Sequence, residues 1–256
     1  MSMRESILQE LKQVEEQKGV RILHAVESGS RSWGFSSPDS DYDVRFVYVR
    51  PMEDYLRVNE IRDMIEWKLD EVLDINGWDL KKFMRLCANG NATPFEWMNS
   101  PDVYYTTPEW HEIAGVCKGY FSEKSAVNHY LGLATNTWHK FLTGETVRYK
   151  KYFYALRPLL CARYIERYHQ APPMLFSDLL KMDLPDDVRR AIGELLEKKK
   201  VTGESTESPH ILPVRDYIRD ELDRQKEISR AIPADSGKGM EEINRCFARA
   251  VGFRFS

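Results

Sequence analysis

A segment near residue 30 combines small, hydroxyl and acidic side chains in a spacing that suits phosphate and metal chemistry. Gly29 and Ser30 follow one apolar run, and Asp41 and Asp43 open the next. Residues i and i+2 of an extended chain project from the same face, so we expect Asp41 and Asp43 to present two carboxylates side by side. Such charges repel each other unless a cation lies between them, and proteins bind Mg²⁺ through one or two carboxylates together with substrate phosphates. The pair therefore predicts a divalent cation site.

The small residues before this pair predict a complementary phosphate site. Gly29 allows the backbone to pass close to a ligand, because glycine carries no side chain. The hydroxyl of Ser30 and the amides that follow it can donate hydrogen bonds to phosphate oxygens at the start of a short helix. We expect one end of the segment to hold phosphate and the other end to hold the cation.

A site for two metal ions usually requires a further carboxylate, and the chain offers two candidates. Asp79 ends the third predicted strand, where we expect a neighbouring strand to bring it beside the first pair. Asp74, within the same strand, is the competing candidate. Asp79 also has a purely structural interpretation, since an aspartate just before Leu80 can cap a helix and stabilise it by about 1 kcal/mol.

The elements that must position these residues follow from the periodicity of the apolar side chains. Apolar and β-branched runs predict strands at 20–26, 43–49 and 72–80, and helical spacing predicts helices at 5–18 and 81–88. Beyond Gly119 the pattern becomes almost entirely helical, with predicted helices at 126–142, 147–168, 188–199, 214–231 and 240–251. We therefore expect a mixed α+β domain at residues 1–118 and a helical domain at residues 119–256.

Composition narrows the class of protein further. The 256 residues are 42% hydrophobic and 30% charged, which excludes a disordered or collagen-like chain. No apolar run approaches the ~18 residues of a membrane span, so we expect a cytoplasmic protein without a membrane partner. The four cysteines (Cys87, Cys117, Cys161 and Cys246) lack zinc-binding spacing, and we expect reduced thiols. The net charge of −3 gives no independent support for a long nucleic-acid footprint.

The order of Gly-Ser, a spacer, Asp-x-Asp and a later strand aspartate resembles the DNA polymerase β-like nucleotidyltransferase superfamily. The segments 77–82, 96–101 and 148–158 are similar to a branch of predicted bacterial and phage nucleotidyltransferases, some of which are linked to RNA-repair gene clusters. The resemblance covers most of residues 20–165. It implies a small mixed sheet flanked by helices, followed by a helical domain that closes over the nucleotide.

The same resemblance assigns roles to individual residues. Asp41 and Asp43 become metal ligands that bridge to a nucleoside triphosphate such as ATP, and Gly29, Ser30 and Arg31 cradle the triphosphate. Asp79 becomes the third carboxylate, which binds the second of two Mg²⁺ or Mn²⁺ ions. The implied reaction is attack of an acceptor hydroxyl on the α-phosphate with departure of pyrophosphate, without a covalent enzyme intermediate.

Two basic clusters are candidates for neutralising the triphosphate. The first cluster begins the helix that follows Asp79, and the second lies along the predicted helix 147–168. The residues are Lys81, Lys82 and Arg85 in the first, and Arg148, Lys150, Lys151 and Arg157 in the second. There Lys150, Tyr154 and Arg157 share one face at i, i+4 and i+7, so spacing alone favours Lys150. The resemblance favours Lys151 and Arg157 instead, and we predict Lys82, Lys151 and Arg157 as nucleotide-binding residues.

The sequence leaves the acceptor of the nucleotide open. The family association favours an RNA 3′ end, including that of a tRNA, whereas a protein hydroxyl or a small molecule such as an aminoglycoside is the alternative. A nucleotide-sugar glycosyltransferase also uses Asp-x-Asp, but there the motif ends a strand, whereas here it opens one. A catalytically silent nucleotide- or RNA-binding scaffold is disfavoured, because clustered carboxylates without a metal would only repel one another. The sequence defines neither the preferred nucleotide nor the oligomeric state.

Overall fold

The computed structural model describes residues 2–37, 40–201, 207–235 and 237–253 of the 256. The chain forms two compact units. The first unit comprises residues 1–33, 40–121 and 237–256, and the second comprises residues 34–39 and 122–236. Neither unit is a single continuous stretch of chain.

A five-stranded sheet forms the centre of the first unit. Its strands are β1 (Arg21–Ser28), β2 (Tyr42–Val49), β3 (Met64–Leu69), β4 (Leu73–Asp79) and β5 (Val103–Thr106), in the spatial order β3-β4-β2-β1-β5. β2 and β4 run parallel, and the other neighbouring strands pair antiparallel. The beginnings of β2 and β4 therefore lie at the same edge of the sheet.

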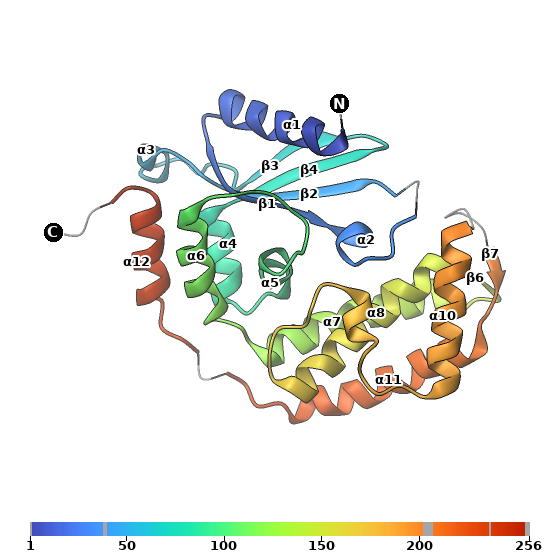
Figure 1. Ribbon diagram of the computed structural model, residues 1–256. Coiled ribbons are helices and arrows are strands. Elements are labelled where there is room, and N and C mark those ends of the chain that lie inside the picture. The colour runs from blue at the N-terminus through green and yellow to red at the C-terminus, as the bar shows by residue number, and fades with distance from the viewer. Residues whose placement is uncertain (1, 38–39, 202–206, 236, 254–256) are drawn as a thin grey trace. The chain divides into compact units, whose positions relative to one another are not determined.

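Helices cover both faces of this sheet (Figure 1). α1 (Met3–Lys18) lies on one face, and α4 (Leu80–Ala88), α5 (Ala92–Met98) and α6 (Pro108–Lys118) lie on the other. Two single-turn helices, α2 (Gly29–Ser32) and α3 (Met52–Tyr55), follow β1 and β2. α12 (Glu241–Ala250) packs against α4 and α6.

Alternation along β2 separates the core from the candidate site. Val44, Phe46 and Tyr48 are buried in the core that also contains Ile7 and Leu11 of α1. Side chains of a strand alternate between the two faces, so Asp43 and Arg45 project to the face opposite α1. In β4 a Cβ atom at Gly77 would lie 2.2 Å from the Phe46 ring, which explains why this position holds glycine.

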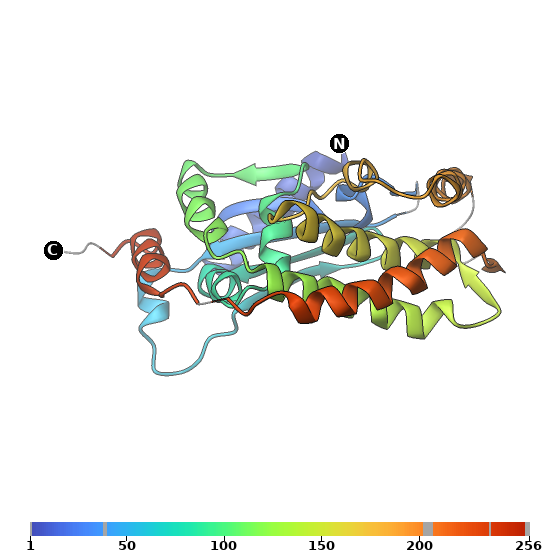
Figure 2. The same cartoon turned by 90° about the horizontal axis from the view of Figure 1, so that it is seen from below.

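The second unit is built mainly of helices. α7 (Glu123–Thr137), α8 (Tyr149–Tyr168) and α11 (Leu212–Ala231) lie side by side (Figure 2). The π-helix η1 (Trp138–Leu142) follows α7 directly, and α9 (Phe176–Leu179) and α10 (Asp186–Val201) pack against α8. Two three-residue strands, β6 (Thr146–Arg148) and β7 (Glu207–Pro209), pair antiparallel.

The mixed α+β class predicted from the sequence is confirmed. The division into domains at residue 118 stays a prediction, and the compact units differ from it in one respect. We expected residues 119–256 to group together, whereas residues 237–253 belong to the first unit because α12 buries Ile243 and Cys246 beside α4 and α6. The ribbon of β6 and β7 was also not expected in a helical region. Within the described part of the chain, no helix is both long and apolar enough to cross a membrane.

Candidate active site

The turn after β1 brings a glycine against a carboxylate. Gly29 has a φ of +64°, and a Cβ atom built there would lie 2.0 Å from Oδ2 of Asp43. Asp43 stands opposite Ser28 in the antiparallel pairing of β1 and β2, which fixes this close approach. Both the left-handed backbone and the space next to Asp43 therefore require glycine at position 29.

Two carboxylates on neighbouring strands share one cation. Asp43 and Asp74 are direct partners in the parallel register of β2 and β4. One guanidinium nitrogen of Arg45 lies 2.8 Å from Asp43 and 2.7 Å from Asp74. The three side chains are only 16% to 25% exposed. Two carboxylates facing one arginine leave negative charge that a further cation could neutralise.

The electrostatics of Asp43 reflect this crowding. Burial raises the pKa of the Asp43 carboxyl above its ordinary value, and the neighbouring charge of Arg45 partly opposes that rise. The negative charges of Asp41 and Asp74 also raise the pKa of Asp43, which indicates that both carboxylates lie close enough to act on it. Asp41 itself is exposed just before β2.

Glu27 binds the backbone of Asp43 and was not among the residues that the sequence motifs pointed to. Its carboxylate accepts a hydrogen bond from the Asp43 amide at 2.9 Å and another from the hydroxyl of Tyr104. Only 2% of Glu27 is exposed, and burial raises its pKa to about 7. A charged residue at the end of the apolar run of β1 was the available signal. Glu27 holds the backbone of Asp43 in place.

Ser30 and Arg31 lie in the turn beside these carboxylates. Ser30 is half-buried within α2. Arg31 donates hydrogen bonds to the carbonyl oxygens of Ser40 and Asp41 at 2.6 and 3.0 Å, and its guanidinium lies 3.7 Å from the centre of the Tyr42 ring. These contacts hold the segment that leads into β2. The predicted roles of both residues toward a triphosphate stay predictions.

Asp79 does not lie beside Asp43, so our expectation for its position in the sheet was wrong. In the parallel register Asp79 is the partner of Tyr48, five positions along β2 from Asp43. That corresponds to about 16 Å at roughly 3.3 Å per residue. Asp79 is the N-cap of α4, accepts hydrogen bonds from the Lys81 amide and the Tyr55 hydroxyl, and is 3% exposed. Asp74 occupies the position that we expected Asp79 to take.

The family model described as RNA repair pathway DNA polymerase beta family matches residues 3–249. The chain belongs to this family. It is therefore a nucleotidyltransferase of the polymerase β type, as the Gly-Ser and Asp-x-Asp pattern predicted.

Two individual proteins are similar to this member of the polymerase beta family. The chain is 38% identical over 253 residues to the uncharacterized protein YcgL of Bacillus subtilis (strain 168), covering 97% of this chain and 96% of YcgL. A nucleotidyltransferase-like protein from Exiguobacterium sibiricum 255-15, known from a crystal structure, is 12% identical with a TM-score of 0.32, over 97% of this chain and 79% of that chain.

The predicted basic residues of this polymerase beta family member lie in different surroundings. Lys82, in the first turn of α4, forms an ion pair with Asp63 at 3.0 Å and lies near Asp79, at the other end of β4 from Asp74. Lys151 on α8 lies 3.9 Å from the centre of the Phe141 ring. Arg157, also on α8, is 3% exposed and donates to the sulfur of Met174 at 3.3 Å. Nucleotide binding by these three residues stays a prediction.

The donor chemistry of the acidic cluster fits a divalent cation. Asp41, Asp43 and Asp74 supply hard carboxylate oxygens, which are the ligands that Mg²⁺ and Mn²⁺ prefer. Among the described residues, no group of three or more acidic, histidine or cysteine side chains is already arranged to hold an ion. Mg²⁺ commonly binds through one or two carboxylates and completes its shell with water and phosphate. Asp43 and Asp74 are two such carboxylates, and in this structure both pair with Arg45.

Proposed function

We propose that this nucleotidyltransferase transfers a nucleoside monophosphate from a nucleoside triphosphate to the 3′ hydroxyl of an RNA, in a reaction that depends on Mg²⁺ or Mn²⁺. The observation that carries the proposal is the pairing of Asp43 with Asp74 on parallel strands, directly beside the Gly29 turn. Carboxylates that could bind cations and a turn that could bind phosphates thus lie together where β2 and β4 begin. The family description, which names an RNA repair pathway, supports RNA as the acceptor.

The residues of this site would divide the work as follows. Asp41, Asp43 and Asp74 would hold the cations, with Glu27 fixing the Asp43 backbone through its amide. When bound, the cations supply charge that lowers the pKa of the attacking hydroxyl and neutralises the triphosphate. The turn at Gly29 and Ser30 would donate hydrogen bonds to phosphate oxygens.

The reaction itself is a displacement at phosphorus. The acceptor oxygen forms a bond to the α-phosphorus while the bond from that phosphorus to its bridging oxygen breaks, and pyrophosphate leaves. The hydroxyl proton passes to a carboxylate or to water. Glu27, Asp43 and Asp74 contribute by keeping donors and acceptors in position, so that little reorganisation is needed during the reaction.

The test is to incubate the purified protein with Mg²⁺ or Mn²⁺, each α-³²P-labelled triphosphate, and a mixed pool that includes tRNA. We expect label on RNA that is lost in Asp43→Asn. Label on the protein or on a small molecule would contradict RNA as the acceptor. No label with any triphosphate, metal or acceptor would contradict the proposed reaction.

A matched pair of substitutions on β4 tests the third carboxylate. Asp74→Asn should abolish labelling, because it replaces the carboxylate beside Asp43 with a neutral amide. Asp79→Asn should retain labelling, because Asp79 lies far from Asp43 along the sheet. Asparagine is also a good N-cap, but it removes the charge that pairs with Arg50 at 3.5 Å, so we expect a loss of stability without a loss of labelling. The opposite result would restore Asp79 as the catalytic residue.

A further inference from the structure

A cavity of about 650 Å³ lies in the first unit, at the end of β2 and β4 that is remote from Asp43 and Asp74. The segment 50–63, which includes α3, and the beginning of α4 form its walls. Six of its lining side chains are basic and four are acidic. The basic ones are Arg50, Arg57, Arg62, Lys81, Lys82 and Arg85.

The basic side chains that line the cavity outnumber the acidic ones, so positive charge remains after they pair. Asp63 is shared by Lys82 at 3.0 Å and Arg85 at 3.2 Å. Lys81 is exposed and forms no ion pair within the described parts of the chain. The side chain of Arg85 is 64% exposed, and exposed ion pairs contribute little, so it can exchange Asp63 for another anion.

The position of these lysines works against the stability of α4. Lys81 and Lys82 lie in the first turn of the helix, where the carboxylates that oppose this effect are the Asp79 N-cap and Asp63, the ion-pair partner of Lys82. The helix macrodipole disfavours cations at this end by a few tenths of a kcal/mol or more each. Residues that break a local rule of this kind are expected where a ligand compensates for them. The excess of basic side chains in the cavity and the sharing of Asp63 by two cations indicate an anionic ligand.

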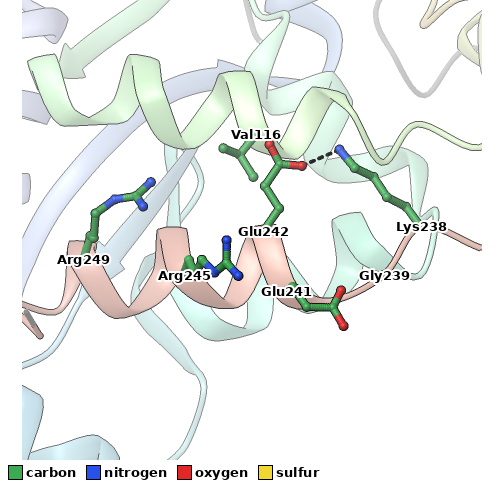
Figure 3. A pocket seen from close by; sticks show the side chains of 7 residues that line it. All are labelled: Val116, Lys238, Gly239, Glu241, Glu242, Arg245 and Arg249. Carbon is green, nitrogen blue, oxygen red and sulfur yellow. Dashed lines mark ion pairs between the residues drawn. The ribbon is translucent and has the colours of Figure 1, made fainter. Parts of the chain in front are cut away.

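The cavity beside α12 provides a contrast (Figure 3). It has a volume of about 370 Å³, and Lys238 pairs with Glu242 at 2.7 Å within it. Arg249 pairs with Glu112 at 2.6 Å. Lys238 and Arg249 each have a carboxylate of their own. Among the described residues that line this cavity, no carboxylate is shared by two cations as Asp63 is, and we assign this cavity no ligand.

The distance along the sheet indicates which phosphates would bind in the cavity lined by residues 50–63 and 79–85, which we call the basic cavity. The triphosphate of the proposed reaction would lie beside Asp43 and Asp74, whereas Asp79 in the cavity wall is about 16 Å further along β4 at roughly 3.3 Å per residue. Stacked nucleotides rise about 3.4 Å each, so a strand with its 3′ hydroxyl at Asp43 has phosphates at this distance about five nucleotides back. A small-molecule acceptor would not extend so far.

We propose that the cavity at residues 50–63 and 79–85 binds backbone phosphates of a single-stranded RNA acceptor, with Lys81 and Arg85 as the main contacts. This inference rests on the proposed nucleotidyl transfer for the position of the 3′ end. It names the acceptor as a polynucleotide strand and gives that strand a direction across the first unit.

The test is the affinity of a fluorescein-labelled 12-nucleotide RNA, measured by anisotropy with EDTA and without triphosphate across a series of salt concentrations. The variant is Lys81→Ala with Arg85→Ala, both exposed positions whose replacement leaves the core intact. We expect affinity to fall about 10-fold and the salt slope to decrease by about 1.4, since each phosphate contact to single strands contributes about 0.7. The control, Lys12→Ala with Lys118→Ala, removes the same charge from exposed positions outside the cavity and should bind like the wild type.

The outcomes separate this inference from the proposed function. Equal affinity and slope for the two double variants, or no RNA binding by the wild type, would overturn the inference even if nucleotide transfer to another acceptor is found. Binding that depends on Lys81 and Arg85, together with normal RNA affinity in Asp43→Asn, supports it. If RNA binding depends on Lys81 and Arg85 but the wild type transfers no nucleotide, the proposed reaction is contradicted and the proposed RNA site is retained. Competition by free ATP at equal phosphate concentration would show a nucleotide site instead and overturn the inference.

Discussion

The two ends of β2 and β4 carry opposite arrangements of charge. At the beginning of these strands, the carboxylates of Asp43 and Asp74 share the single cation of Arg45. At the other end, the cations of Lys82 and Arg85 share the single carboxylate of Asp63. The cluster at the beginning of the strands therefore has an excess of one negative charge, and the cluster at the other end has an excess of one positive charge. One compact unit can therefore offer the proposed cation site and the proposed phosphate site at opposite ends of the same two strands.

The largest effect on binding should come from replacing one carboxylate at each end of β2 and β4 with an amide, in separate variants. Asp43→Asn should lower Mn²⁺ affinity by about 100-fold or more, because even groups that only support metal ligands are worth 10- to 100-fold. Asp63→Asn should leave Mn²⁺ affinity unchanged and strengthen RNA binding a few-fold, because it removes the competitor for Lys82 and Arg85. Isothermal titration calorimetry measures both. Equal loss of Mn²⁺ affinity in the two variants would remove the contrast between the ends.

Removal of the shared arginine should reveal the repulsion at the acidic end. Arg45→Met leaves Asp43 and Asp74 unpaired, and we expect a loss of about 2 kcal/mol in the free energy of unfolding, reduced by partial solvent exposure. Mn²⁺ should restore more stability to this variant than to the wild type, because the cation no longer competes with arginine. Urea unfolding with EDTA or Mn²⁺ measures this. Arg249→Met, which removes an exposed pair with Glu112, serves as the control.

Gly29 and Gly19 form a matched pair for the geometry of the acidic end. Both have positive φ, at +64° and +60°, but a Cβ atom would meet Asp43 only at position 29 and has no neighbour within 4 Å at position 19. Gly19→Ala should cost about 1 to 2 kcal/mol of stability from backbone strain and leave Mn²⁺ affinity unchanged. Gly29→Ala should cost at least as much and weaken Mn²⁺ binding too. Unchanged binding in Gly29→Ala would show that Asp43 tolerates displacement.

A histidine at the centre of the sheet should make the free energy of unfolding depend on pH, without changing Mn²⁺ or RNA binding at either end. His24 on β1 is 6% exposed, lies 3.1 Å from the Thr106 hydroxyl and stacks on Trp110 at 4.5 Å. Burial lowers its pKa from 6.5 to about 4. The unfolded chain therefore takes up a proton before the folded one, and the free energy of unfolding falls as pH decreases from about 6.5 to 4.

His24→Asn should remove that component, so its stability should fall less steeply over the same pH range than that of the wild type. We expect a difference below about 1 kcal/mol at pH 6, measured by urea unfolding. Mn²⁺ and RNA affinities should match the wild type at pH 7.5. A steeper loss of stability in the variant would contradict a neutral, buried imidazole.

Local features of the site were predictable from the sequence, and long-range pairing was not. Gly29, Asp41 and Asp43 lie in one short segment, so their types and spacing were sufficient to identify a candidate site. The choice between Asp74 and Asp79 depended on the direction of β4 relative to β2, which no local pattern encodes. Parallel pairing places Asp74 beside Asp43 and moves Asp79 to the opposite end.

The parts of the fold that escaped prediction share a physical cause. β3 and β5 lie at the two edges of the sheet, and their exposed residues hide the alternation that marks a half-buried strand. The role of Glu27 depends on Tyr104, which is distant in the chain and comes close only through the pairing of β1 with β5. The long helices of the second unit, by contrast, were visible from their own periodicity.

The packing of α12 has a consequence for synthesis. This helix follows the second unit in the chain, yet it buries Ile243 and Cys246 beside α4 and α6 of the first. On the ribosome, the apolar side of α4 and α6 therefore stays uncovered until the whole second unit has been translated. Because α4 also carries Lys81 and Arg85, we expect the proposed RNA site to be complete only when the first unit is complete.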